Sequence, residues 1–326
     1  MNSGTTAKDQ SKFKKTAKGS TQLLDTGCNS AAGRQRERNE DACGLPPRGA
    51  DQARLGTLLV VADGVGGMPG GAAASRQAAQ DLQALYYAGF GPKEPGERLR
   101  YCVEAVNAIN RLHSQPGEPA SGYLTTLVAA VAAGDQIWVA NVGDSRAYLI
   151  QKQTRRRIKL TEDHSQETQL AKRGLASETG GAQAEGVITR AIGLEARCQV
   201  DTYHYAWSPG DRLVLCSDGL AQVPEQDMID LALGQPASAA AERLVARAIQ
   251  VDGSDNCTAA VAGWLEAPPR RREAGAKPRP NRRRRSPAAS RTQTLLPLLL
   301  GLLLGWLSAA LLAIYWLEAA GITNLF

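Results

Sequence analysis

Apolar runs and amphipathic stretches alternate along the chain and predict its secondary structure. Short apolar runs bounded by Gly, Asp or Asn are typical of buried strands. Such runs occupy residues 55–62, 124–133, 136–142, 145–150, 212–217 and 258–264. Longer segments of helical character occupy residues 72–88, 97–114, 226–233 and 237–250. Because the strands arrive in hairpins and the helices in separate pairs, the pattern predicts a layered α+β fold rather than an alternating parallel βαβ sheet.

The two ends of the chain lack this pattern. Residues 1–20 are rich in Lys, Ser, Thr and Gly, and residues 267–294 are rich in Pro and Arg, so neither segment can bury a core. We predict a disordered basic segment at 1–20, a folded domain at 21–266 and a linker at 267–294. Residues 295–317 form a run of 23 residues without a charge, which is long enough for a transmembrane helix. Residues 318–326 are then expected to be a short extracytoplasmic tail.

The charges beside the apolar run predict its orientation in a membrane. The Arg-rich linker precedes the run, and positively charged flanks stay on the cytoplasmic side. We therefore expect a single-pass, tail-anchored protein of the inner (cell) membrane with a cytoplasmic catalytic domain. The alternative for residues 295–317 is a buried core helix.

The distribution of charge narrows the choice of partners. The net charge of the chain is +6, but the positive charge is concentrated in the two tails, and residues 21–269 carry a net charge of −6. An acidic domain between basic tails is not the profile of a nucleic-acid-binding core, so no nucleic acid is expected as a partner. An acidic cleft that collects cations fits this composition better.

Carboxylates recur where the predicted strands end, next to glycines or other small residues. The segments are LLVVADGVGG at 58–67, IWVANVGDSR at 137–146, RLVLCSDG at 212–219, DGSDNCTAAVAG at 252–263 and RNED at 38–41. The acids in them are Asp63, Asp144, Asp218, Asp255, Glu40 and Asp41. A single Asp-Gly after a strand is usually a turn. Several such acids gathered in one place would repel one another and would need protons or metal ions.

The residue types favour a particular class of metal. Carboxylate and carbonyl oxygens suit hard divalent cations such as Mg²⁺ and Mn²⁺. The chain has three histidines, at no metal-binding spacing, which argues against a histidine-rich zinc site. The glycines after Asp63, beginning with Gly64, allow backbone carbonyls to approach an ion closely.

Eight motifs together resemble one enzyme family. In chain order they are RQRERNEDA (34–42), VVADGVGG (60–67), LTTLVAA (124–130), ANVGDSRAYLI (140–150), LTEDHS (160–165), VITRAIG (187–193), GDRLVLCSDGL (210–220) and GSDNCTAAV (253–261). This set resembles the metal-dependent type 2C serine/threonine protein phosphatases in their short bacterial form. The resemblance covers about residues 21–265. It implies a four-layer α/β/β/α sandwich of two antiparallel sheets flanked by helix pairs, to which the chain adds one C-terminal transmembrane helix.

The resemblance also implies roles for individual residues. Asp63 would bridge two metal ions, with the Gly64 carbonyl on one of them, and Asp218 and Asp255 would complete the direct ligands. Three further acids and one arginine would complete the site.

Among these, Glu40 and Asp41 would contact the metals through water, and Asp144 would bind a third ion. Arg36 would hold the phosphate, since a guanidinium grips two oxygens at once. The catalytic residues implied are thus Arg36 and Asp63.

The implied reaction is hydrolysis of phosphoserine and phosphothreonine on proteins by a bridging hydroxide at a two-metal centre, with two to three Mn or Mg ions. The implied partners are phosphorylated proteins and a cognate serine/threonine protein kinase at the membrane, whose signalling the enzyme would reverse. Val65 stands where many eukaryotic members have a histidine, so the general acid stays unassigned. His164 is expected to be structural rather than an acid catalyst. Residues 166–186 correspond to a flap that could choose substrates, or to a variable surface loop.

Two other functions compete with this one. Cys28 and Arg34 have the C-x₅-R spacing of cysteine-dependent phosphatases, although no glycine stands midway between them. The chain could also be a catalytically weak pseudophosphatase that serves as a membrane-anchored, phosphoprotein-binding scaffold. Such a scaffold would not need Asp63, Asp218 and Asp255 together.

Overall fold

The computed structural model describes residues 24–65, 70–113, 123–172 and 187–264. By its internal contacts the chain divides into residues 1–269 and residues 270–326, and the second unit lies outside the described residues. The predictions for residues 1–20, 267–294 and 295–326 therefore stay predictions. Among the described residues, no helix is long and apolar enough to cross a membrane.

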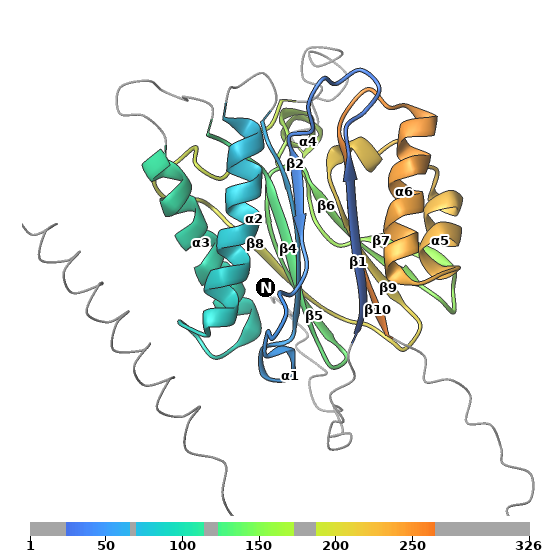
Figure 1. The fold of residues 1–326 in the computed structure, drawn as a ribbon, viewed down its shortest axis with the longest axis horizontal. Coiled ribbons are helices and arrows are strands. Elements are labelled where there is room, and N and C mark those ends of the chain that lie inside the picture. Colours follow the sequence, from blue (N-terminus) through green and yellow to red (C-terminus); the bar gives the residue numbers. More distant parts are fainter. Residues whose placement is uncertain (1–23, 66–69, 114–122, 173–186, 265–326) are drawn as a thin grey trace, which may run out of the picture. The chain divides into compact units, whose positions relative to one another are not determined.

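Ten strands form two five-stranded sheets in which every pairing is antiparallel (Figure 1). The strands are β1 (Leu24–Ala31), β2 (Asp41–Gly44), β3 (Thr57–Asp63), β4 (Leu127–Ala133), β5 (Gln136–Val142), β6 (Arg146–Gln151), β7 (Arg156–Lys159), β8 (Asp201–Ala206), β9 (Arg212–Cys216) and β10 (Cys257–Trp264). Sheet 1 has the order β1-β10-β9-β6-β7, and sheet 2 has the order β2-β3-β4-β5-β8.

A pair of helices covers the outer face of each sheet, as Figure 1 shows. Helices α2 (Gly71–Ala88) and α3 (Pro95–His113) pack on sheet 2, and helices α5 (Glu225–Leu233) and α6 (Ala237–Val251) pack on sheet 1. Three short helices, α1 (Gln52–Leu55), α4 (Gln166–Lys172) and the 3₁₀ helix η1 (Asp218–Leu220), lie in connections. The predicted four-layer sandwich is thus confirmed for the described residues.

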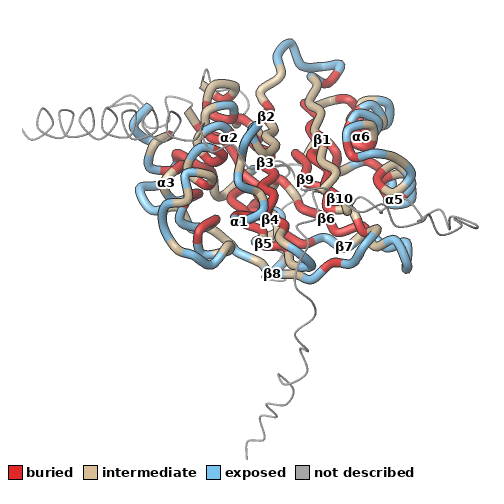
Figure 2. Tube along the Cα trace, turned by 60° about the horizontal axis from the view of Figure 1, so that its bottom comes forward, coloured by how far each residue is buried: buried red, intermediate tan, exposed pale blue. Residues whose placement is uncertain are grey.

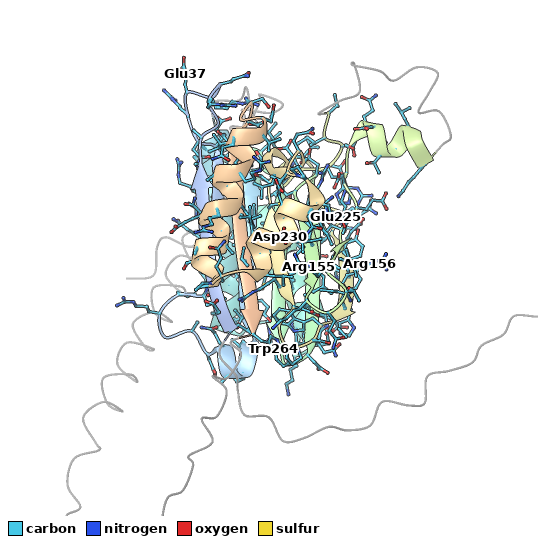
Figure 3. All side chains as sticks on the ribbon, turned by 90° about the vertical axis from the view of Figure 1, so that its right-hand side faces the viewer. Glu37, Arg155, Arg156, Glu225, Asp230 and Trp264 are labelled. Carbon is cyan, nitrogen blue, oxygen red and sulfur yellow. The ribbon has the colours of Figure 1, made fainter. Side chains whose placement is uncertain are left out.

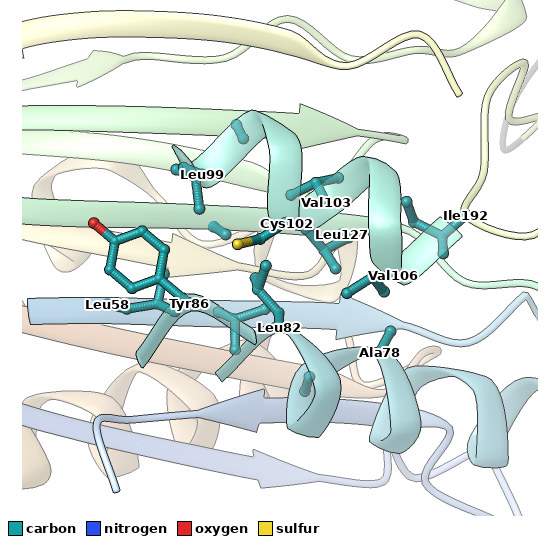
Figure 4. Close-up of a cluster of buried hydrophobic side chains, with 14 of the residues drawn as sticks. Leu58, Ala78, Leu82, Tyr86, Leu99, Cys102, Val103, Val106, Leu127 and Ile192 are labelled. Atoms are coloured by element: carbon teal, nitrogen blue, oxygen red, sulfur yellow. The ribbon is translucent and has the colours of Figure 1, made fainter. Parts of the chain in front are cut away.

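Each interface between two layers has its own apolar core. One core lies between α2, α3 and sheet 2, and it contains Leu58, Leu82 and Tyr86 (Figure 4). A second lies between α5, α6 and sheet 1, and a third lies between the two sheets. Figure 2 shows buried residues along the strands and exposed ones on the outer sides of the helices. Three stacked cores explain why the strands are apolar on both faces.

Close packing of α6 on sheet 1 requires one glycine. A Cβ atom on Gly27 of β1 would lie 2.3 Å from the backbone of Ser238 in α6. Alanines in α6 complete this close approach, since Ala237, Ala240 and Ala241 are fully buried. Tight packing of this kind fixes the helix against β1 and β10.

Two predicted strands begin at least two residues later than the apolar pattern suggested. Leu55 ends α1, so β3 begins at Thr57 instead of residue 55. Residues 124–126 precede β4, and Thr125 makes isolated bridges to Gly64 and Ile192. Strands β1, β2, β7 and β8 were not predicted.

Candidate active site

Asp63 is the last residue of β3, and hydrogen bonds of its backbone groups hold it in place. Its N–H donates to Thr126 Oγ1 at 3.0 Å, and its carbonyl accepts from the Thr126 N–H and the Thr125 hydroxyl, each at 2.8 Å. In the strand ladder Asp63 lies opposite Asp41 of β2. Burial, followed by the charges of Asp41 and Asp218, raises the pKa of Asp63 well above its usual value. The strand therefore places a carboxylate where an ionised form is strongly disfavoured.

Asp41 joins this carboxylate to the second sheet. Its Oδ2 accepts a hydrogen bond of 2.7 Å from the hydroxyl of Ser217, which follows β9 of sheet 1. Its Oδ1 is buried and has no partner among the described residues. Burial raises the pKa of Asp41 to about 6. Ser217 was not identified from the sequence, although its place directly before Asp218 was a signal.

Asp218 and Asp255 come from sheet 1. Asp218 opens η1 just after β9, and Asp255 lies two residues before β10. Burial, followed by the charge of Asp255, raises the pKa of Asp218. One of its oxygens, Oδ1, is buried without a partner among the described residues.

Asp144 lies in the turn between β5 and β6 and completes the group. Burial, followed by the charge of Asp218, raises its pKa to about 7. Five strand ends, from β2, β3, β5, β9 and β10, thus bring their carboxylates to one place.

Four of these acids line a cleft of about 460 Å³. Its walls include Asp63, Asp144, Asp218 and Asp255, together with Glu40, Gly64 and Val65. A wider cleft of about 830 Å³ shares Asp144, Asp218 and Asp255 with it and continues past Arg146 and Lys172. The predicted site residues are therefore brought together, with Asp41 buried opposite Asp63 on the neighbouring strand.

Arg36 lies on the wall of the smaller cleft, as the phosphate-binding prediction requires. Its Nη2 contacts Asp255 Oδ2 at 2.7 Å, and its side chain is 42% exposed. The neighbouring residue Glu37 marks this end of the domain in Figure 3, while Trp264, where β10 finishes, lies at the other end. The cleft and the exit of β10 are thus at opposite ends.

Gly64 has a packing role in addition to the one predicted. A Cβ atom there would lie 2.4 Å from the Gly71 carbonyl and 2.8 Å from the carbonyl oxygen of Glu40. The Gly64 N–H donates to that Glu40 oxygen at 3.1 Å. The glycine is therefore required by the close approach of three backbone segments.

The acids of the cleft offer oxygen atoms as ligands for divalent cations. Among the described residues, no group of three or more His, Cys, Asp or Glu side chains could hold a metal ion as it stands. Burial, together with the charges of neighbouring acids, raises the pKa values of Asp41, Asp63 and Asp218. Carboxyl groups gathered in this way cannot all ionise without compensation, so the cluster needs protons or cations to be stable. Oxygen-only donors and two buried oxygens without partners fit hard cations.

The cysteine-dependent alternative is not supported by the geometry. Cys28 lies inside β1, paired with Ala260 of β10. Arg34 donates to the carbonyl oxygen of Asp252 at 2.9 Å. Cys28 and Arg34 therefore do not frame a phosphate-binding loop.

The fold and the cleft together define a class of protein: a two-sheet α/β/β/α sandwich with carboxylates gathered at one end. Comparison with known proteins identifies the family within this class. A family model described as protein phosphatase 2C matches residues 30–266. The chain therefore belongs to the protein phosphatase 2C family and is a serine/threonine protein phosphatase.

Individual relatives agree with this assignment. The serine/threonine phosphatase stp of Listeria welshimeri is 36% identical over 233 residues, which are 69% of this chain and 90% of that protein. The structure of the serine/threonine phosphatase Stp1 from Staphylococcus aureus matches with a TM-score of 0.66 and 25% identity, over 78% of this chain and all of that one. The catalytic domain of the phosphatase PstP, in complex with two manganese ions, matches with a TM-score of 0.62 and 26% identity, over 76% of this chain and 100% of that one. These relatives favour the enzyme over the scaffold alternative.

Proposed function

We propose that this phosphatase hydrolyses phosphoserine and phosphothreonine on proteins with two to three bound divalent cations, Mn²⁺ or Mg²⁺. The observation that carries the proposal is the meeting of Asp63, Asp144, Asp218 and Asp255 in one cleft, with raised pKa values at the first three. The manganese ions of the PstP catalytic domain support the choice of metal.

The predicted site residues have the following roles in this proposal. Asp63, fixed by its backbone, would hold the cations together with the carbonyl of Gly64, Asp218 and Asp255. Asp144 would hold a third ion, while Glu40 and Asp41 would contact the cations through water. When bound, the cations would activate water and neutralise the charge that develops on the phosphoryl group.

Arg36 is proposed to bind the substrate phosphate. One of its amino groups is engaged with Asp255, which orients the guanidinium on the cleft wall. A planar guanidinium oriented in this way still has donors for two phosphate oxygens. The wider cleft beyond Asp144 and Asp218 gives a flanking polypeptide a place to lie.

The reaction is tested directly with the purified full chain in detergent. Phosphate release is measured from a phosphothreonine peptide with Mn²⁺, with EDTA and after Mn²⁺ is restored. We expect release that is lost with EDTA and recovered with excess Mn²⁺. No release under Mn²⁺ or Mg²⁺ would overturn the proposal and favour the pseudophosphatase scaffold.

We propose further that residues 295–317 anchor the enzyme in the cell membrane with its catalytic domain in the cytoplasm. Support comes from the uncharged run and its Arg-rich flank.

The anchor is tested by membrane fractionation with alkaline extraction. Wild type should stay in the pellet, whereas the double variant Leu303→Arg/Leu311→Arg should move to the supernatant, because each central arginine costs about 3 kcal/mol in a membrane helix. The matched control Ala288→Arg, in the linker, should pellet like wild type. Wild-type protein in the soluble fraction would contradict the anchor.

A membrane-associated serine/threonine kinase is the proposed antagonist, and its own phosphosites are proposed substrates. The pairing of kinase and phosphatase follows from the family context. Phosphoproteomics of a strain lacking the chain, beside one carrying Asp63→Asn, tests it. Kinase phosphosites should rise equally in both strains, and unchanged kinase phosphorylation would remove this proposal.

A further inference from the structure

His164 is a buried histidine whose two ring nitrogens are both engaged. The residue is 6% exposed and lies between β7 and α4. Its Nδ1 accepts a hydrogen bond of 3.0 Å from the N–H of Gly143, and its Nε2 lies 3.0 Å from Asp201 Oδ2. Gly143 directly precedes Asp144, so the ring contacts the backbone that carries a cleft carboxylate.

The hydrogen bonds fix the tautomer of this ring. A backbone N–H can only donate, so Nδ1 must be an acceptor and the ring proton must reside on Nε2. Nε2 then donates to Asp201, whose other oxygen accepts from Arg190 Nη1 at 2.9 Å. The same Arg190 nitrogen lies 3.1 Å from Nε2, but two N–H donors cannot hydrogen-bond to each other, so Asp201 is the partner of both. The ring is thereby clamped between a fixed carboxylate and the Gly143 amide.

The backbone of His164 ties the same place to the cleft wall. Its N–H donates to the Gly143 carbonyl at 2.9 Å, and its carbonyl accepts from the N–H of Thr189 at 2.7 Å. Ile188, next to Thr189, bridges to Ser165 and lines the smaller cleft. His164 therefore contacts both the turn that carries Asp144 and the segment that contributes Ile188 to the cleft.

The Gly143 turn needs such support because its conformation is unusual. Gly143 has φ +109°, and a Cβ atom there would lie 2.6 Å from Thr126 Cβ. Its carbonyl also accepts from the Asn141 side chain at 3.2 Å. A backbone held this way from three directions fixes where the next side chain points.

We propose that His164 is a positioning residue: by holding the Gly143 amide through Nδ1, it keeps the Asp144 carboxylate in the cation-binding cleft. The inference rests on the proposed function only in treating Asp144 as a cation ligand. It assigns no proton transfer to His164, since both ring nitrogens are occupied and the ring lines neither cleft.

Two isosteric substitutions in the full chain separate positioning from packing. The oxygen of Asn can take the place of Nδ1, whereas the amide of Gln can take the place of Nε2. We therefore compare His164→Asn with His164→Gln. The matched control is His204→Gln, since His204 is exposed on β8 and stacks on Trp138 at 5.0 Å.

The readouts are amide hydrogen exchange at Gly143 without metal, and Mn²⁺ binding followed by calorimetry. His164→Gln should exchange Gly143 about 10- to 100-fold faster, which corresponds to the loss of one buried hydrogen bond. It should also weaken the weakest Mn²⁺-binding step about tenfold, as loss of a supporting contact does. His164→Asn and His204→Gln should stay near wild type in both measurements.

Wild-type exchange and Mn²⁺ binding in His164→Gln, or equal losses in His164→Asn and His164→Gln, would overturn the proposal. If neither His164 variant folds, Asp201→Asn replaces them, and unchanged Mn²⁺ binding there would overturn it equally. Failure of the wild type to bind Mn²⁺ would instead contradict the proposed function, while the exchange measurement would still test the role of His164.

Discussion

The two sheets meet through two very different regions. In the middle of the sandwich, Leu59 and Val61 of sheet 2 pack with Leu215 and Ala260 of sheet 1, all of them fully buried and apolar. At one end, the residues that meet are acids, with Asp41 bonded to Ser217 across the sheets. The first region stabilises the sandwich, and the second opposes it until protons or cations balance the charge. The large apolar region therefore offsets the destabilising effect of the acids at the site.

The largest effect is expected from Asp63→Asn. Loss of the central ligand should lower the rate of phosphopeptide hydrolysis by about 10³-fold or more, since this carboxylate organises the cations. The metal-free variant should at the same time be more stable than wild type, because one repelling charge is gone. Steady-state kinetics and thermal unfolding measure both effects.

Asp135→Asn is the control for this substitution, since Asp135 is exposed in the turn between β4 and β5. It should change neither activity nor stability. Retained activity in Asp63→Asn would contradict the assignment of catalysis to the acidic region.

The apolar region should give the reverse result. Leu215→Ala, at a fully buried position between the sheets, should lower the free energy of unfolding by about 2–5 kcal/mol. Denaturant titration measures this loss. The Mn²⁺ affinity of the molecules that remain folded should be unchanged. A large loss of Mn²⁺ affinity at low temperature would contradict the separation of the apolar region from cation binding.

The pH dependence of the metal-free enzyme sharpens the comparison further. The folded pKa values of Asp41 and Asp144 are raised to about 6 and about 7, so between the unfolded pKa and these values the folded state binds more protons. Stability is fully present below about pH 4 and is lost as pH rises through the folded pKa values. The loss should amount to several kcal/mol and should largely disappear with Mn²⁺. If the free energy of unfolding of the metal-free enzyme stays constant from pH 4 to 8, the pKa values of these carboxyl groups are not raised.

Arg36→Ala should have the smallest effect of the four. Loss of the phosphate contact should raise KM about tenfold for a phosphopeptide, with a partial recovery in Arg36→Lys. Arg155→Ala is the matched control, because Arg155 pairs with Asp230 on the α5 side (Figure 3) and lines neither cleft. Equal KM values for Arg36→Ala and Arg155→Ala would remove Arg36 from substrate binding.

Much of the fold was predictable because its central strands are apolar on both faces. Strands β3, β4 and β5 were found from continuous apolar runs, and the four long helices from their spacing. Strand β8 was not predicted, because its sequence DTYHYA lies at a sheet edge, where its positions alternate between half-buried and exposed and none is fully buried. Strand β1 escaped because its polar sequence LDTGCNSA is strand-like only through its pairing with β10.

The acids of the candidate site could be predicted from the sequence, whereas the residues that hold them in place could not. Asp63, Asp144, Asp218 and Asp255 stand out because carboxylates recur at the ends of several apolar strands. Contacts such as Ser217 with Asp41 join residues 176 positions apart, and no local pattern announces them. His164 was recognised as structural, but its contact with Gly143 depends on how the strands pack.

The central claim is that acids from both sheets form one cation centre, and Mn²⁺ binding in a double-mutant cycle tests it most directly. Calorimetry on the wild type, Asp63→Asn, Asp218→Asn and the double variant gives the number of ions and their affinities. The account predicts that each single variant loses most of the Mn²⁺ binding and that the double variant loses little more. Independent, additive losses, or full binding in either single variant, would show that the two sheets do not share a centre.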